Sequence, residues 1–187
     1  MLFRSLALAT AVRFPGRVRS MLLVTPPATW LTDTPYDGET IGAHRRDEPE
    51  LAAAVQSMMR GAPATEADFQ RALMVEAPAG YARWGDAERA HAPIGALSLA
   101  AASAWFTDIP EDAAAQILAA DLPPTLVVGG ERDLLTGLEP VRAFATALGA
   151  RFAGIADCGH YPWVEQPAAF RAIAAEWLST VGARDGR

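Results

Sequence analysis

Hydrophobic residues recur along this chain with two periods, and the period indicates which segments are helices and which are strands. Near the N-terminus, apolar residues spaced three or four apart predict a helix that ends at Pro15–Gly16. Its expected apolar face consists of Leu2, Leu6, Ala9 and Val12. The continuous apolar run of residues 20–27, SMLLVTPP, is stopped by prolines and predicts a buried strand.

The last third of the chain continues in the same strand–helix order. Residues 123–130, PPTLVVGG, predict a second buried strand, and residues 151–157 predict a third strand, with a helix between them that closes at Gly149. A final helix is predicted to begin at Pro167. The expected apolar faces of these two helices are Val141, Phe144, Ala145 and Leu148, and Phe170, Ile173, Ala174, Trp177 and Leu178. Strands that alternate with helices pair in parallel, with right-handed crossovers.

Residues 28–120 lack this order and predict several short helices separated by breakers. One helix is expected to have Leu51, Val55, Met58 and Met59 on a single face. A second is expected to begin after Thr65 as its cap, with Phe69, Ala72 and Leu73 as its apolar side. Residues 95–106 and 111–120 are further helical candidates. The frequent methionines and tryptophans fit either the core of these small helices or the lining of an apolar pocket.

Composition narrows the class of protein. The length of 187 residues fits one domain, and an apolar fraction of 51% is enough for a hydrophobic core. A net charge of −6 argues against a nucleic-acid surface. A single cysteine excludes an internal disulfide and favours a reducing compartment, so we expect a cytoplasmic protein. The arginine-rich first twenty residues allow a targeting peptide as an alternative, but the apolar residues 6–12 are too few to span a membrane.

Two polar residues follow strands of the predicted sheet at the points where these strands end. Asp133 comes just after the strand of residues 123–130, and His160 comes just after the strand of residues 151–157. Adjacent parallel strands would bring both to one edge of the sheet, where a carboxylate can orient an imidazole that acts as a base. Taken singly, Asp133 also fits a turn or helix cap, and His160 a loop histidine with a satisfied hydrogen bond.

The sequence offers no pattern for a cofactor. Its three histidines and one cysteine lie too far apart for a zinc site. Gly129–Gly130 is not followed by the rest of a dinucleotide fingerprint or a P-loop. We therefore expect no cofactor and no metal.

The segments PTLVVGGERDLLTG and IADCGHYPWVEQPAAFRAIAAEWL resemble the last third of an α/β-hydrolase, and SLALATAVRFPGRVRSMLLVTPP resembles the helix and strand that follow the nucleophile in that family. The similarity is to the proline-iminopeptidase-like branch. It implies an α/β fold of about three parallel strands with flanking helices and an inserted helical lid. The implied divisions are a helix and strand over residues 1–27, a lid over residues 28–120 and a C-terminal α/β core over residues 121–187. The resemblance makes His160 and Asp133 the catalytic histidine and acid.

The same resemblance places the nucleophile position of the family's G-x-S-x-G motif at or next to Met1, where no such motif is present. Ser5 lies about one helical turn too late, and Cys158 fits a small packed residue better than a nucleophile. His44 and His91 fall in the lid, with surface or cap roles as the default. We therefore expect a truncated α/β-hydrolase fold that lacks its nucleophile and is inactive as given.

The sequence leaves two functions open. The first is a serine hydrolase that cleaves an ester or amide bond, including a peptide bond, in a small apolar substrate. The alternative is a non-catalytic relic that binds a ligand or a partner. In either case we expect no membrane contact. The edge of the first strand would be exposed, which favours a homo-oligomer.

Overall fold

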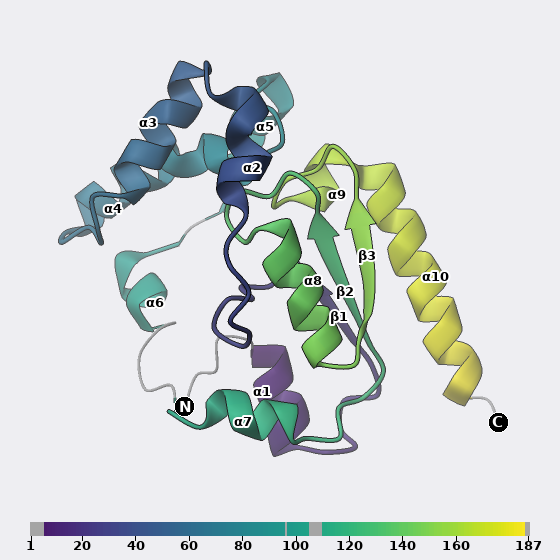
Figure 1. Cartoon of the computed structure of the whole chain (residues 1–187). Helices are drawn as coiled ribbons and strands as arrows, with labels where there is room; N and C mark the ends of the chain where they lie inside the picture. Colours follow the sequence, from purple (N-terminus) through teal and green to yellow (C-terminus); the bar gives the residue numbers. More distant parts are fainter. Residues whose placement is uncertain (1–5, 96, 105–109, 186–187) are drawn as a thin grey trace.

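A parallel sheet of three strands forms the centre of the computed structural model, which describes residues 6–95, 97–104 and 110–185. Its strands are β1 (Met21–Val24), β2 (Thr125–Gly130) and β3 (Arg151–Ile155), in the order β1-β2-β3. Val24 pairs with Val128, and Gly130 pairs with Ile155. The predicted α/β architecture of three parallel strands with flanking helices is therefore confirmed (Figure 1).

The central strand β2 is buried along its whole length, because helices cover both faces of the sheet. Val127 points into one core, whereas Leu126 and Val128 belong to the core on the other face. Alternate side chains of a strand point to opposite faces, so a strand covered on both sides reads as one apolar run. This explains why TLVV has no charged position.

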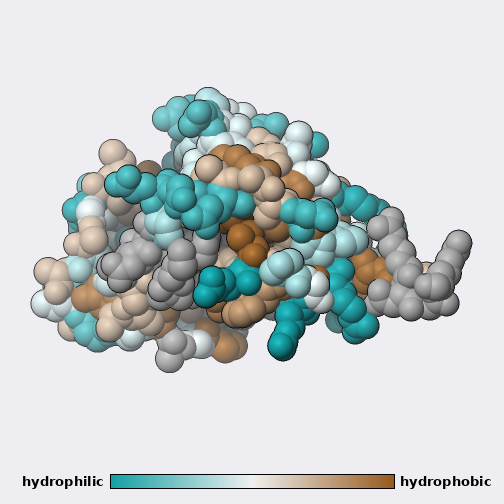
Figure 2. All heavy atoms as spheres, turned by 90° about the horizontal axis from the view of Figure 1, so that it is seen from below, coloured by the Kyte–Doolittle hydropathy of each residue, from teal (hydrophilic) through white to brown (hydrophobic). Residues whose placement is uncertain are grey.

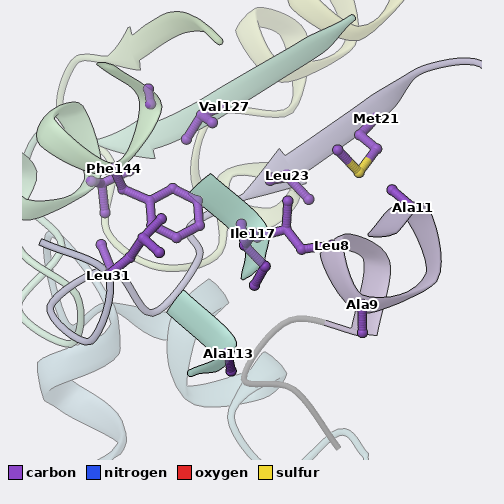
Figure 3. Close-up of a cluster of buried hydrophobic side chains, with 13 residues drawn as sticks. Leu8, Ala9, Ala11, Met21, Leu23, Leu31, Ala113, Ile117, Val127 and Phe144 are labelled. Atoms are coloured by element: carbon purple, nitrogen blue, oxygen red, sulfur yellow. The ribbon is translucent and has the colours of Figure 1, made fainter. Parts of the chain in front are cut away.

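Three helices form the layer on the first face: α1 (Leu6–Arg13), α7 (Ala113–Leu118) and α8 (Leu138–Ala147). Leu8 of α1 and Ile117 of α7 are fully buried and meet Leu23 of β1 (Figure 3). Phe144 of α8 is also fully buried beside Val127 in this cluster. Two elements about a hundred residues apart in the chain, α1 and α7, therefore share one hydrophobic core.

The second face is covered by one long helix, α10 (Pro167–Asp185), which follows the short helix α9 (Pro162–Glu165). Trp177 is buried against β2 and β3, and Phe170 and Ile173 pack beside it. The prediction that Leu178 also faces inward is wrong, since 64% of its surface is exposed. Leu178 follows Trp177 by one residue, about 100° around the helix, which turns it away from the sheet.

The remaining helices, apart from α6, which lies lower, form a group near and above the carboxyl ends of the strands (Figure 1). They are α2 (Gly38–Gly42), the 3-10 helix η1 (Ala43–Arg45), α3 (Pro49–Met58), α4 (Glu66–Glu76), the 3-10 helix η2 (Ala77–Gly80), α5 (Asp86–His91) and α6 (Leu99–Ala104). As predicted, the Thr65 side chain caps α4 by accepting a hydrogen bond from the Asp68 N–H at 3.2 Å. Trp105 and Phe106, in the predicted helix of residues 95–106, lie outside the described residues.

Two of the predicted apolar faces are rotated in the structure. In α1 the predicted Ala9 and Val12 do pack in the core, but Leu6 is 58% exposed. Leu8, which is fully buried, takes its place, so the buried face of α1 is turned part of the way around the helix. The predicted partner Leu2 lies outside the described residues. In α3 only Leu51 of the predicted face is buried, and Met59, just after the helix, is 82% exposed. Spacing showed that these helices are amphipathic, but not which side their neighbours would cover.

The chain is tied to the core where it enters these upper helices. The Asp37 carboxylate accepts the N–H groups of Leu138 and Glu139 at 3.1 Å and 3.0 Å, and so satisfies the first turn of α8. The neighbouring Tyr36 hydroxyl donates to the carbonyl of Leu134. Both contacts join residues about a hundred positions apart.

None of the helices described is both long enough and apolar enough to cross a lipid bilayer.

Candidate active site

Asp133 is held by the turn that follows β2. Its side chain is fully buried. The carboxylate accepts hydrogen bonds from the Leu135 N–H at 2.8 Å, the Thr136 N–H at 3.3 Å and the Thr136 hydroxyl at 2.5 Å. Such donors stabilise a buried negative charge and fix the direction in which its free lone pairs point.

His160 lies in the loop after β3, and its ring contacts Asp133. Its Nδ1 is 2.9 Å from Asp133 Oδ2, so the contact expected from the strand ends is present. A carboxylate can only accept, and the neutral imidazole therefore carries its proton on Nδ1 and leaves a lone pair on Nε2. Nε2 has no hydrogen-bond partner among the described residues, and 24% of the side chain is exposed. This arrangement suits a general base; the catalytic roles of His160 and Asp133 stay a prediction.

Two glycines allow the His160 loop, residues 156–160, to approach its neighbours closely. A Cβ on Gly130 would lie 2.1 Å from the Gly159 carbonyl oxygen. A Cβ on Gly159 would lie 2.7 Å from the Gly80 carbonyl oxygen and 2.8 Å from the Ala82 nitrogen. The end of β2, the loop and residues 80–82 therefore pack backbone against backbone, which no larger residue allows at these two positions.

Glu165 of α9 is a buried carboxylate that sequence reasoning missed. Its Oε1 accepts the Gly159 N–H at 2.8 Å, and its Oε2 accepts the Ala82 N–H at 2.7 Å. Burial raises the pKa of Glu165, against the lowering effect of these backbone donors, and the charge of Glu88 raises it further. The residue lies in the segment PWVEQP, but its partners are backbone N–H groups, so the residue types of that segment do not predict what the carboxylate binds.

Aromatic rings surround the other side of His160. The rings of His160 and Tyr161 meet edge to face with their centroids 5.2 Å apart, and Tyr161 packs on Tyr81 at 4.8 Å. The Tyr81 hydroxyl is 2.7 Å from Nδ1 of His91 in α5. Burial is the main cause that raises the pKa values of both tyrosines. His91 thus joins α5 to the aromatic wall beside His160.

The other sequence candidates lie apart from the ring of His160 or outside the described residues. Cys158 is fully buried, and burial, with the carboxylates of Glu165 and Asp133, raises the pKa of its thiol to about 12. A thiol of this kind is protonated at neutral pH and a poor nucleophile. His44 contacts Arg132 at 2.7 Å on the surface. Ser5 and Met1 lie outside the described residues.

An apolar cavity of about 680 Å³ opens beside the turn that follows β2 and carries Asp133, called here the acid loop. Leu51, Val55 and Met58 of α3 form one wall, and Leu134, next to Asp133, forms another. A smaller hollow of about 330 Å³ shares Met58 and Leu134 with the cavity and reaches Leu135 and Thr136. Residues 6–95, 97–104 and 110–185 contain no group of three or more histidine, cysteine or acidic residues arranged to hold a metal ion.

No protein-family model matches this chain, and no curated protein matches it. Solved structures do match over most of its length. An esterase from Exiguobacterium antarcticum is 13% identical with a TM-score of 0.62, and 92% of this chain and 62% of the esterase are covered. A thermophilic esterase from Thermogutta terrifontis is 23% identical with a TM-score of 0.53, with coverages of 94% and 61%. An N-acyl homoserine lactone degrading enzyme, Est816, is 22% identical with a TM-score of 0.50, with coverages of 91% and 62%.

These likenesses define the fold of the chain. Its three parallel strands and flanking helices match part of the α/β-hydrolase fold. The chain spans about three fifths of the length of the solved structures that it matches.

Proposed function

We propose that His160 and Asp133 are the histidine and acid of an α/β-hydrolase-type serine hydrolase. The 2.9 Å contact between His160 Nδ1 and a fully buried Asp133 carries this proposal, since it leaves Nε2 as the basic nitrogen. In the reaction, a serine hydroxyl loses its proton to Nε2 as the oxygen attacks a carbonyl carbon, and Asp133 stabilises the imidazolium that forms. The proton then passes from Nε2 to the leaving alcohol or amine.

The substrate proposed is a small, mostly apolar ester or amide. The apolar cavity, which is lined by Leu134, the residue after Asp133, supports this choice. The sequence resemblance to proline-iminopeptidase-like hydrolases adds an amide or peptide bond to the candidates. We propose that a cap covers this cavity and that α2 to α5, within the predicted lid of residues 28–120, form the cap. A cytoplasmic location belongs to the same proposal.

The proposal includes a nucleophile that this chain does not supply. The chain contains no G-x-S-x-G motif. On p-nitrophenyl acetate it is expected to give no turnover above its own His160→Ala variant. A clear difference between the two would overturn the proposed inactivity. In-frame codons before Met1 that encode an apolar strand and G-x-S-x would supply the serine, whereas a stop codon there would favour the alternative function.

The acid–histidine pair has a separate test that requires no turnover. With ¹⁵N-labelled histidine, the neutral His160 ring is expected to show the Nδ1–H tautomer in NMR spectra. Asp133→Asn is expected to shift the ring toward the Nε2–H tautomer, because an amide can donate to Nδ1. An unchanged tautomer in Asp133→Asn would count against the pair.

A ligand-binding module is the second candidate, favoured by the same open cavity. Met58 and Val75 are exposed to the same extent, 44%, but only Met58 lines the cavity. Met58→Glu is expected to weaken the binding of the dye anilinonaphthalene sulfonate about tenfold, or ~1.4 kcal/mol, because the bound dye would cover the new carboxylate and bring its own negative charge near it. Val75→Glu is the matched control and should leave the affinity unchanged. Equal effects of both substitutions would argue against binding in the cavity.

A homo-oligomer through β1 is proposed for either function. Among the described strands β1 pairs only with β2, so it is an edge of the sheet. Leu6 of α1 and Leu22 of β1 line a shallow apolar depression at this edge. Seen from below, on the side where α1 and α7 lie, the molecule shows hydrophobic residues among hydrophilic ones (Figure 2). Exposed strand edges favour pairing with another chain. Sedimentation is expected to show a dimer or larger species, and a stable monomer would contradict this.

A further inference from the structure

Thr25, the residue after β1, has a strained backbone. Its φ is 43°, in the left-handed region that a β-branched residue rarely adopts. Such a conformation costs free energy and persists only where surrounding contacts hold it. Thr25 is 4% exposed, and its N–H donates to the Val128 carbonyl at 2.8 Å. The strain therefore lies at the carboxyl end of the sheet, one strand away from the acid loop.

The side chain of Thr25 binds the backbone of His160. The Thr25 hydroxyl donates to the His160 carbonyl oxygen at 3.1 Å, across 135 positions of the chain. With the backbone turned at Thr25, the hydroxyl can reach beyond the strand end to the loop after β3.

The peptide groups on both sides of His160 are fixed in a similar way. Its own N–H donates to the Gly80 carbonyl at 2.8 Å. The preceding N–H, on Gly159, donates to the buried Glu165 carboxylate, which also holds the Ala82 N–H. Contacts from the end of β1, from η2 and from α9 thus hold the backbone of the histidine, and only the side-chain torsions remain to be set by Asp133.

We infer that Thr25 and Glu165 are positioning residues for His160. Thr25 holds the carbonyl side of the histidine, and Glu165 holds the amide side and ties it to residues 80–82. Together they fix the position of the His160 backbone, from which the side chain extends, and so determine whether Nδ1 reaches Asp133. This inference rests on the proposed role of His160, and neither residue touches the reacting atoms in it.

The test for Thr25 reads the His160 ring directly. Thr25→Val keeps the shape and the branching at Cβ but removes the hydroxyl, and Thr25→Ser keeps the hydroxyl. In Thr25→Val the ratio of Nδ1–H to Nε2–H tautomers of His160 is expected to fall about fivefold, the effect of one lost hydrogen bond of ~1 kcal/mol. Thr25→Ser is expected to retain the wild-type ratio. The His160→Gln spectrum, which lacks the signal, assigns it.

The test for Glu165 uses a second buried glutamate as its control. Glu88 of α5 is 6% exposed and accepts the Gly85 N–H at 3.0 Å. Among the described residues it acts on Glu165 through its charge and makes no hydrogen bond to the His160 loop. Glu165→Gln is expected to lower the tautomer ratio of His160 and to speed hydrogen exchange at the Gly159 amide. Glu88→Gln is expected to lower stability without either effect. Should Thr25→Val fail to fold, this pair decides the inference with the same signal.

A merely structural role for both residues would lower the stability of the variants while the His160 tautomer stays unchanged, and that result would overturn the inference. The failure of the proposed function would look different. In that case the wild-type ring would itself lack the Nδ1–H tautomer, or Asp133→Asn would leave it unchanged.

Discussion

The His160 loop and the exposed side of α3, called here the open face, differ in whether their side chains are held by hydrogen bonds or left uncovered. Around His160, the buried carboxylates each have partners: Asp133 holds three donors and a ring nitrogen, and Glu165 holds two N–H groups. On α3, Val55 and Met58 are about half exposed and line an apolar cavity with few polar contacts. Chemistry needs groups fixed in direction, and binding of an apolar molecule needs uncovered surface. The two regions therefore differ most in how they should tolerate substitution.

The largest effect is expected from Asp133→Ala. The substitution leaves two N–H groups, a hydroxyl and the His160 ring without their acceptor in a buried place, and each loss costs about 1–3 kcal/mol. We expect the free energy of unfolding in urea to fall by about 3 kcal/mol or more. Asp121→Ala, at an exposed carboxylate, is the control and should change it by less than about 0.5 kcal/mol. A small effect of Asp133→Ala would mean that the loop is not fixed by this carboxylate.

Gly159→Ala is expected to come next. Its methyl group would lie 2.7 Å from the Gly80 carbonyl oxygen, so the backbone of residues 80–82 must shift, at about 2 kcal/mol. Gly182→Ala is the matched control, because a Cβ there meets no atom within 4 Å. In helix α10 that alanine is expected to stabilise the protein by up to about 1 kcal/mol. Thermal unfolding of both variants distinguishes them, and equal melting temperatures would contradict the close packing of the loop.

A pH effect of intermediate size is expected from Cys158. The folded-state pKa of its thiol is about 12, above its ordinary value of 9.0. The folded protein thus holds this proton more tightly, and the resulting stability is complete below about pH 9 and is lost as the pH rises toward 12. Between about pH 7 and 10 the wild type should lose about 1.4 kcal/mol relative to Cys158→Ala. Parallel profiles of unfolding free energy against pH would show that the thiol is not shielded.

The smallest effect is expected on the open face. Met59→Ser changes a side chain that is 82% exposed and should alter the free energy of unfolding by less than about 0.5 kcal/mol. Leu51→Ala, on the buried side of the preceding helix α3, should lower it by about 2 kcal/mol or more. If Met59→Ser were as costly as Leu51→Ala, the open face would be a core in solution, covered by another molecule.

The sequence predicted the sheet well because β1 and β2 are continuous apolar runs that proline or glycine stops, and β3 is a mostly apolar run between two predicted helices. It predicted the meeting of Asp133 and His160 for the same reason, since strand ends alone determine which edge of the sheet each residue reaches. For α1 the sequence identified Ala9 and Val12 as core residues but not Leu8, because Leu6 and Leu8 are equally apolar and only the neighbouring strand and helix distinguish them. Thr25 and Glu165 were missed because their partners are backbone groups, which every residue has, so the sequence does not show which of them these side chains bind.

The Asp37 carboxylate, which satisfies the start of α8 from a position about one hundred residues earlier, limits how the molecule can move. Residues 36 and 37 are anchored to the α/β layers, so the upper helices cannot swing about the point where the chain first enters them. Any hinge that widens the entrance to the cavity must lie further along the chain than Asp37. Asp37→Ala should loosen the upper helices at this attachment, while residues 80–82 stay held by Glu165 and the His160 loop.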